Sequence, residues 1–276
     1  MSVNRGIYRL LKTYLYRHSV DNEGRSLSAT YYGRVDVKTT DSVGRTPLSY
    51  AASNDDCRLL SILLRRNDID VNRTDFQNHT LFFYAVYMGH NEAVQKLLAD
   101  TRLNPNLASN NLSPLAIAAN SDSTELLQML LSDQRVTVNS QDHGSLDLLI
   151  WALFQRREGS CLRLLHAPNV DVNCSWDTIS ALIWGILLNH TAVAFEMLKK
   201  DQIDVSHQDD AGGTARMCAI EMENDEVSMA LLGRKDTNLA LENVRGESVL
   251  DYALKSNQSK MLAEIRQKLH GVAGSN

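Results

Sequence analysis

Acidic and imidazole side chains precede a tryptophan in the middle of this 276-residue chain. Asp142, His143 and Asp147 lie a few residues before Trp151. Titratable groups beside an apolar wall are typical of a small-molecule pocket. Such a pocket could perform acid–base chemistry on an apolar substrate. Whether these side chains form a pocket or an open contact surface depends on the elements that position them.

Other catalytic signatures are absent from the sequence. It contains no GxxxxGK[ST] phosphate loop, no GxGxxG fingerprint, no HExxH zinc motif and no GxSxG motif. Its cysteines, Cys57, Cys161, Cys174 and Cys218, are scattered without a CxxC pair, so we expect neither a disulfide framework nor a zinc site. We therefore predict that the protein is not an enzyme and holds no cofactor or metal.

The composition indicates a folded protein with little attraction to nucleic acid. Hydrophobic residues make up 43% of the chain and charged residues 22%, with a formal net charge of -5. Charges interrupt the N-terminal segment every few residues, so we expect no signal peptide and no membrane span. These features predict a soluble protein of the cytoplasm or nucleus. The charge is uneven, because residues 201–247 carry four Lys and Arg against eleven Asp and Glu.

Three columns of residues recur at a nearly constant interval, which is the signature of repeat architectures. Small residues follow one another at intervals of 33 or 34 at Ala51, Ala85, Ala118, Ala152, Gly185, Ala219 and Ala253. Twelve residues later in each unit comes an apolar residue, at Leu63, Leu97, Leu130, Leu164, Met197, Leu231 and Ile265. A polar column follows at Asn72, Asn106, Asn139, Asn173 and Ser206.

Each unit has the pattern of two short helices and a turn. Thr46 can cap a first helix with Pro47 in its first turn, and Leu48 and Ala51 then share one face. The apolar run at 59–64 predicts a second helix. No unit of this size can bury its own apolar face, so the units must stack.

The first complete unit resembles the ankyrin repeat. The resemblance rests on GRTPL at residues 44–48, the Ala pair at 51–52, the Leu pair at 63–64 and the DVN turn at 70–72. It covers roughly residues 20–270. The later units keep the spacing but lose the Thr-Pro pair. The resemblance implies an all-α, ankyrin-repeat solenoid of stacked helix–turn–helix units with short β-hairpin-like turns, monomeric and binding another protein.

We expect one continuous array with modified ends. Residues 1–40 are predicted to be a degenerate N-terminal capping repeat with a helix over residues 7–18, and residues 41–240 the main repeats. Residues 241–270 are expected to form a C-terminal capping repeat, with a polar outer helix over 260–269. Residues 271–276 are expected to be a frayed tail.

The concave groove of the array is the predicted binding surface. At 100° per residue, position 50 lies about 160° from the core side of its helix, and positions 53 and 54 flank it. Apolar and aromatic residues there and on the turn tips indicate an interface. The alternative is that they pack against neighbouring turns. The predicted contacts are Tyr50, Phe76, His79, Tyr84, Tyr87, Met88, His143, Trp151, Phe154, Trp176, Trp184 and Leu188.

Two further sets of residues have competing interpretations. His90 is expected to bond backbone between units, and the Asn column is expected to bond the turn backbone, so both are expected to be structural. Asp142, His143, Trp151 and Trp184 should meet across two neighbouring units, which keeps a small apolar ligand or substrate as the alternative function.

Overall fold

The computed structural model describes residues 37–38, 40–121, 123–139, 141–142, 146–256 and 259–273. The chain forms two compact units, Met1–Thr137 and Val138–Asn276, here termed unit 1 and unit 2. The helix expected over residues 7–18 lies outside the described residues. None of the described helices has the length and apolar character needed to cross a bilayer.

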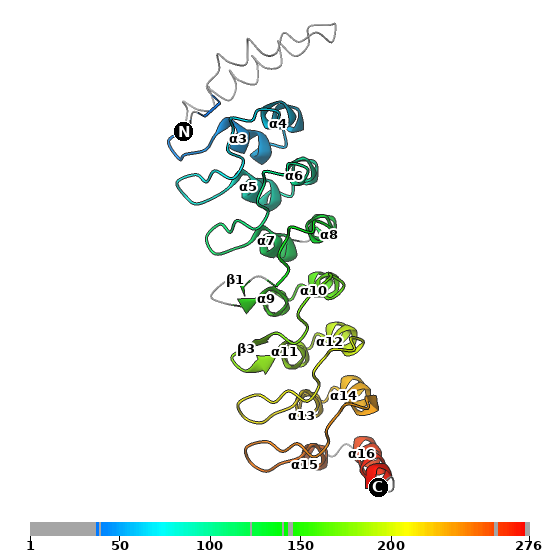
Figure 1. The fold of residues 1–276 in the computed structure, drawn as a ribbon. Helices are drawn as coiled ribbons and strands as arrows, with labels where there is room; N and C mark the ends of the chain where they lie inside the picture. The colour runs from blue at the N-terminus through cyan, green and yellow to red at the C-terminus, as the bar shows by residue number, and fades with distance from the viewer. Residues whose placement is uncertain are drawn as a thin grey trace. The chain divides into compact units, whose positions relative to one another are not determined.

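The described part of unit 1 consists of three helix pairs (Figure 1). The first helix of each pair packs against the first helix of the next pair, and second helices pack likewise. The pairs are α3 (Pro47–Ser53) with α4 (Cys57–Leu64), α5 (Leu81–Tyr87) with α6 (Asn91–Leu98), and α7 (Pro114–Asn120) with α8 (Thr124–Leu131). The predicted helix–turn–helix unit is confirmed.

Unit 2 repeats the same arrangement in its described residues, with packing between α9, α11, α13 and α15 and between the helices that follow them. The pairs are α9 (Leu148–Phe154) with α10 (Glu158–Leu165), α11 (Ala181–Leu187) with α12 (Thr191–Leu198), α13 (Ala215–Glu221) with α14 (Asp225–Gly233), and α15 (Val249–Lys255) with α16 (Ser259–Ala273).

Short antiparallel hairpins precede the first helices, as predicted. Strand β1 (Gln141–Asp142) pairs with β2 (Leu146–Asp147), and β3 (Ser175–Trp176) pairs with β4 (Ile179–Ser180). Four further repeats have a single bridge at the same place, for example between Thr74 and Thr80. We refer to the residues between the two sides of each hairpin as the tip of that repeat.

Side-chain caps fix where the first helices begin. The Thr46 hydroxyl accepts a hydrogen bond from the Ser49 amide at 3.2 Å, which satisfies one of the free donors of α3. Thr80, Ser113, Ser180 and Thr214 cap their helices in the same way. The predicted Thr46 cap is confirmed, and Ser180 and Thr214 keep a capping hydroxyl where the Thr-Pro motif is lost, whereas Asp147 forms no cap bond.

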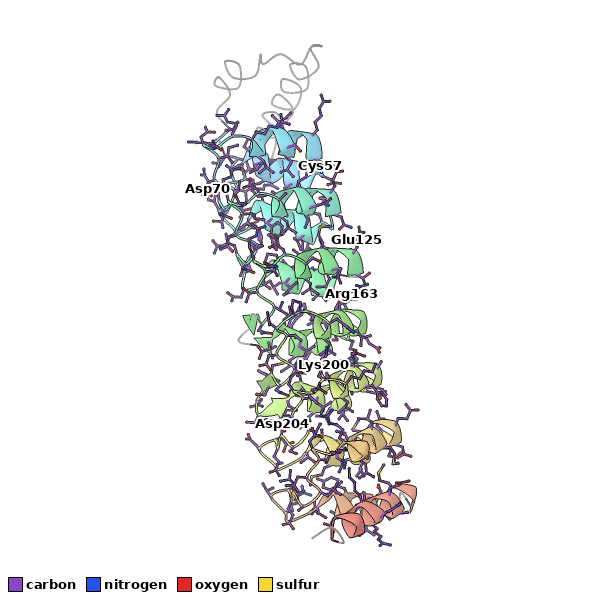
Figure 2. All side chains as sticks on the ribbon, turned by 45° about the vertical axis from the view of Figure 1, so that its right-hand side comes forward. Cys57, Asp70, Glu125, Arg163, Lys200 and Asp204 are labelled. Carbon is purple, nitrogen blue, oxygen red and sulfur yellow. The ribbon has the colours of Figure 1, made fainter. Side chains whose placement is uncertain are left out.

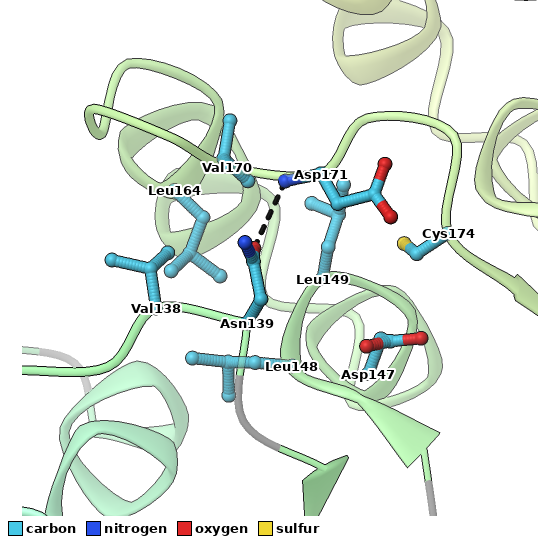
Figure 3. Close-up of a pocket in the computed structure, with 9 residues that line it drawn as sticks. All are labelled: Val138, Asn139, Asp147, Leu148, Leu149, Leu164, Val170, Asp171 and Cys174. Atoms are coloured by element: carbon cyan, nitrogen blue, oxygen red, sulfur yellow. Dashed lines mark hydrogen bonds between the residues drawn. The ribbon is translucent and has the colours of Figure 1, made fainter.

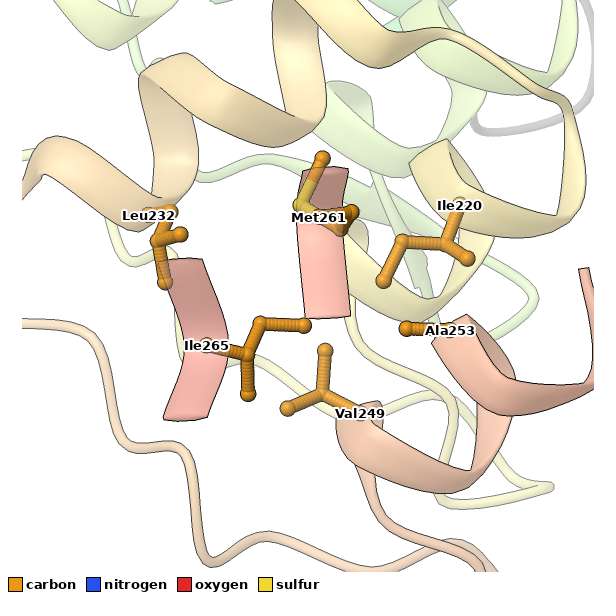
Figure 4. Packing of buried hydrophobic residues seen from close by; sticks show 6 residues of the cluster. All are labelled: Ile220, Leu232, Val249, Ala253, Met261 and Ile265. Carbon is orange, nitrogen blue, oxygen red and sulfur yellow. The ribbon is translucent and has the colours of Figure 1, made fainter. Parts of the chain in front are cut away.

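The small-residue column allows the first helices to approach closely. Its alanines, Ala51, Ala85, Ala118, Ala152, Ala219 and Ala253, are completely buried. At the C-terminal end of unit 2, Val249 and Ala253 of α15 pack with Met261 and Ile265 of α16 (Figure 4). Ile220 and Leu232 from the preceding repeat complete this cluster.

Asparagines clamp the turn of one repeat to the turn of the next. The Asn72 amide donates to the Arg102 carbonyl at 2.8 Å, and its oxygen accepts from the Asn104 amide at 2.8 Å. Asn106 and Asn173 repeat both bonds, in unit 1 and unit 2 respectively. The neighbouring Asp70, labelled in Figure 2, accepts the Asn72 backbone amide. The structural role predicted for the Asn column is confirmed.

The last helix differs from the sequence-based expectation. Helix α16 runs from Ser259 to Ala273 and so includes residues 271–273, which were expected to be frayed. The run of helix-forming residues continues through this segment, since only Gly271 weakens it. Residues 274–276 lie outside the described residues.

Candidate functional site

The tips of unit 1 are held in place by backbone contacts that only glycine permits. Gly44 has a φ of 88°, and a Cβ atom there would lie 2.9 Å from the backbone nitrogen of Phe76. The Phe76 amide donates to the Val43 carbonyl at 2.9 Å. Neighbouring tips in this unit therefore lie directly against each other, which fixes the position of the Phe76 side chain.

An aromatic surface covers the tip and the first helix of the α5 repeat. We define the unit 1 aromatic surface as Phe76, His79, Phe83, Tyr87 and Met88. Phe76 is 77% exposed, Tyr87 64% and Met88 53%. The His79 ring stacks on Phe83 at 4.2 Å between centroids, and Phe83 stacks on Tyr87 at 5.5 Å. The three rings form one stack from the tip to the end of α5.

Phe83 was missed by the sequence analysis. The equivalent position is completely buried in other repeats, at Ala116 and Ile183. The Phe83 ring is instead half-buried between His79 and Tyr87. Its size was the available signal, because a large ring cannot occupy a space that fits alanine.

The tyrosines at position 50 of the first two described repeats hold the tips. The Tyr84 hydroxyl donates to the buried Asp75 carboxylate at 2.5 Å, and the Tyr50 hydroxyl donates to Asp41 at 2.7 Å. Burial and the bond to Asp75 raise the pKa of Tyr84. The Arg45 guanidinium lies 4.7 Å above the Tyr50 ring. Both tyrosines are half-buried, so only part of each ring is available to a partner.

Unit 2 contains a second aromatic group, the unit 2 aromatic cluster of Phe154, Trp176 and Trp184. Phe154 meets Trp184 edge-to-face at 4.7 Å and Trp176 edge-to-face at 5.5 Å. The Trp184 indole donates to the Trp176 carbonyl at 3.4 Å. Trp176 is 39% exposed, whereas Phe154 and Trp184 are half-buried. The cluster joins two neighbouring repeats, and Leu188 at the end of α11 is also half-buried.

The expectation that Trp151 points into the groove is wrong. Its side chain is only 5% exposed. The 100° projection treats a helix as isolated, but the β1–β2 hairpin folds against α9, and α11 packs beside it. Cys218 at the equivalent position is likewise buried. Position 50 therefore lies at the junction between the first helix and its tip.

The structure describes only part of the small-molecule pocket predicted around Asp142 and His143. Asp142 is paired with Leu146 in the hairpin, and His143 lies outside the described residues. A small pocket lies beside Asp147, Asp171 and Cys174 (Figure 3), with a volume of about 10 Å³. That space holds at most one water molecule. The pocket also includes the clamp in which Asn139 accepts the Asp171 amide at 2.9 Å.

The pKa shifts of these titratable groups in unit 2 result from burial and do not indicate catalytic activation. Burial and the neighbouring Asp171 raise the pKa of Asp147, whose side chain forms no cap bond. Burial also raises the pKa of the Cys174 thiol beside the pocket. Elsewhere in unit 2 it raises the pKa of the Cys161 and Cys218 thiols to about 12, so both are weak nucleophiles at neutral pH. In the described part of the chain, no group of three His, Cys, Asp or Glu side chains is arranged to hold a metal ion.

Half-buried His90 and buried His190 are structural. His90 Nε2 lies 3.2 Å from the Ser53 carbonyl, and His190 Nε2 lies 3.0 Å from the Leu153 carbonyl. Each bond links the start of a second helix to the end of the preceding repeat's first helix. The structural role predicted for His90 is confirmed.

Comparison with known proteins identifies the repeats. Residues 9–107 match the family model for ankyrin repeats in three copies. The solved ankyrin repeat domain of Bcl-3, a unique member of the IkappaB protein family, superposes with a TM-score of 0.65 at 17% identity, covering 81% of this chain and 99% of that one. The chain has the ankyrin-repeat fold.

A second ankyrin structure supports the same fold. The human ASB11 ankyrin repeat domain is 21% identical, with a TM-score of 0.56, and the match covers 81% of this chain and 97% of that chain. At these identities the likeness establishes the fold alone. Ankyrin repeat domains generally mediate protein–protein interaction and are typically not enzymes.

Proposed function

We propose that this protein is an interaction module that binds a partner protein through its tips and first helices. The observation that carries the proposal is the unit 1 aromatic surface, on which Phe76, Tyr87 and Met88 are each more than half exposed. Contiguous exposed apolar side chains mark interaction sites, and Tyr and Met are enriched at interface centres.

The exposed aromatic side chains of unit 1 have the geometry of an ordered docking surface. The backbone contact between Val43 and Phe76 fixes the tip, and the stack of His79, Phe83 and Tyr87 fixes the rings. A partner would therefore meet side chains that are already ordered, which lowers the entropic cost of binding. The alternative of a small-ligand site is less well supported, because Trp151 is buried and the described pocket beside Asp147 has a volume of about 10 Å³.

Site-specific photo-crosslinking tests the proposal. A photoreactive amino acid at position 87 should capture a protein partner from cell extract, because this side chain points into solvent. The matched control places the same group at Gln95, an exposed residue on the second helix of the same repeat. Equal capture at both positions, or capture at neither, would contradict the proposed surface.

A double variant gives an independent test. Tyr87→Ser with Met88→Ser should abolish partner capture and leave the thermal unfolding midpoint nearly unchanged, since both side chains are largely exposed. Retained capture by the folded double variant would show that the partner binds elsewhere.

A further inference from the structure

We infer that the aromatic cluster of unit 2 receives a basic and apolar segment of the partner protein. This inference rests on the proposed function and adds the chemistry of the bound segment. It is carried by the side chains that surround Trp176 and Trp184 on the tips and first helices of the α11 and α13 repeats.

The surroundings of the cluster are strongly acidic. Residues 175–190 and 207–223 carry five carboxylates and a single Lys or Arg, which is Arg216. Arg216 is 2% exposed and offers no charge to the surface. Four of the carboxylates are exposed: Asp177, Asp210, Glu221 and Glu223.

These four carboxylates are not neutralised within the protein. In the described residues none of them forms an ion pair with Lys or Arg. Met222, between Glu221 and Glu223, is 46% exposed. The acidic region therefore carries its own apolar contact point beside the charges.

Hydrogen bonds join the acidic tip to the aromatic tip. The Thr178 carbonyl accepts from His207 Nε2 at 2.6 Å, with the donor tautomer that this contact requires. The Thr178 hydroxyl accepts from the Asp210 amide at 3.2 Å. Because Thr178 follows Trp176 and Asp177 directly, these bonds hold Asp177 and Asp210 beside the aromatic tip. Glu221 and Glu223 follow at the end of α13, in the same repeat as Asp210.

This combination selects for cationic side chains. Lys and Arg would be attracted by the carboxylates and can lie over the indole face, and an adjacent apolar residue can pack on Phe154. Acidic protein segments, nucleic acid and anionic lipid would be repelled by the same charges. A basic segment of a partner protein is the occupant that satisfies both features.

A pair of synthetic peptides tests the inference on the full chain. The basic probe has the sequence GKRLFRKG and the acidic probe GEDLFDEG, so that both carry the same Leu-Phe core. Tryptophan fluorescence reports binding directly, because two of the three tryptophans of the chain belong to the cluster. We expect the basic probe to bind, with an affinity that falls as salt is added, and the acidic probe not to bind.

Charge-neutral variants assign the binding to this surface. Glu221→Gln with Glu223→Gln should weaken the basic probe roughly fivefold, the effect expected from losing two exposed ion pairs. Trp176→Ala should weaken binding of the basic probe more strongly than this double variant does. The matched control, Asp201→Asn with Glu226→Gln, removes the same charge elsewhere in unit 2 and should leave the affinity unchanged.

The outcomes separate this inference from the proposed function. Equal binding of both probes, or an unchanged affinity in the Glu221/Glu223 variant, would overturn the inference. Failure of the basic probe to bind while position 87 still crosslinks a protein would also overturn it and would leave the proposed function intact. If position 87 no longer crosslinks a protein while the basic probe binds normally, only the unit 1 surface is contradicted.

Discussion

Arg216 occupies a position that apolar residues fill in the other repeats. The equivalent residues are Leu48, Phe82, Leu115, Leu149, Leu182 and Leu250. Among the described residues, none of the three guanidinium nitrogens has a hydrogen-bond partner. Burial lowers the pKa of Arg216 to about 10. A buried charge without a partner destabilises the folded state.

Replacing this arginine should stabilise the protein. We expect Arg216→Leu to raise the free energy of unfolding by about 1–4 kcal/mol, the range seen when buried ionic groups are replaced by well-packed apolar residues. Urea denaturation at pH 7 measures the change. Because the folded-state pKa lies below the unfolded value, the native penalty is relieved as pH rises above about 10, and the advantage of leucine should shrink there.

A matched arginine distinguishes this effect from a general loss of charge. Arg234→Leu removes the bonds to the Leu198 carbonyl and to Asp236, so this variant should be less stable than the native protein. Stabilisation by both substitutions would show that the missing partners of Arg216 do not explain its effect.

The Tyr84 hydroxyl contributes to stability through its bond to buried Asp75. We expect Tyr84→Phe to lower the free energy of unfolding by roughly 1.5–3 kcal/mol, the usual contribution of a hydrogen bond to a charged group. Tyr87→Phe, in the same helix but exposed, should change it by less than about 0.5 kcal/mol. If both variants lose a similar amount of unfolding free energy, the role of Tyr84 in holding the tip is contradicted.

At the level of elements, arginines tie the ends of α4, α6 and α12 to the repeat that follows each of them. Arg135 donates to the Leu98 carbonyl at 2.5 Å and to the Asp100 carbonyl at 3.1 Å, while Asp133 orients it. Arg102 makes equivalent bonds to the Leu64 and Arg66 carbonyls. These bonds satisfy carbonyls that the ends of the helices leave free.

Removing one such arginine should weaken the stack. Arg135→Ala is expected to cost about 2 kcal/mol, because several charge-assisted hydrogen bonds are lost. The bonds from Arg135 hold the pKa of Asp133 below its usual value, so this stabilisation is complete above the unfolded pKa and is lost as pH falls through the folded one. Denaturation at pH 7 and pH 3 should therefore show a smaller gap between variant and native protein at pH 3. Arg65→Ala, at an exposed helix end, serves as the control.

Elements were the most predictable level of this protein. The Ala and Leu columns predicted the order of the described helices, and Thr46 predicted where one of them begins, because these features are local in sequence. Trp151 could not be placed, since its burial depends on a hairpin folding back on its helix. Phe83 and the pairing of Tyr84 with Asp75 depend likewise on neighbours in space, which periodicity does not report.

For the whole molecule, the two units differ in charge and in closeness to the family pattern. Unit 2 carries 13 Lys and Arg against 19 Asp and Glu, whereas unit 1 carries 15 against 14. The family model matches within unit 1, at residues 9–107. The two surfaces proposed for binding thus have different chemistry, and each can be tested without the other.

Stability in such a stack depends on contacts between neighbouring repeats. Ile265→Ala in α16 should cost roughly 2–5 kcal/mol locally. Hydrogen exchange should then accelerate in α14–α16, which share the Ile265 cluster, and stay unchanged in α3–α8. Arg266→Ala at the exposed neighbouring position should have little effect. Faster exchange throughout the chain would contradict nearest-neighbour coupling.

The asparagine clamps lie at a constant distance along the chain from the first helix of each repeat. From each small residue at positions 51, 85, 118, 152 and 185 to the clamp residue that follows, the distance is always 21 residues, whereas the distance from a clamp to the next small residue is 12 or 13. All variation in length therefore falls in the tips. One glycine inserted after Asn110 should barely change the melting temperature, whereas the same insertion after Leu103 should break the clamp formed by Asn72 and lower it sharply. The tips can thus gain or lose residues, and so acquire new partners, while the spacing between repeats stays constant.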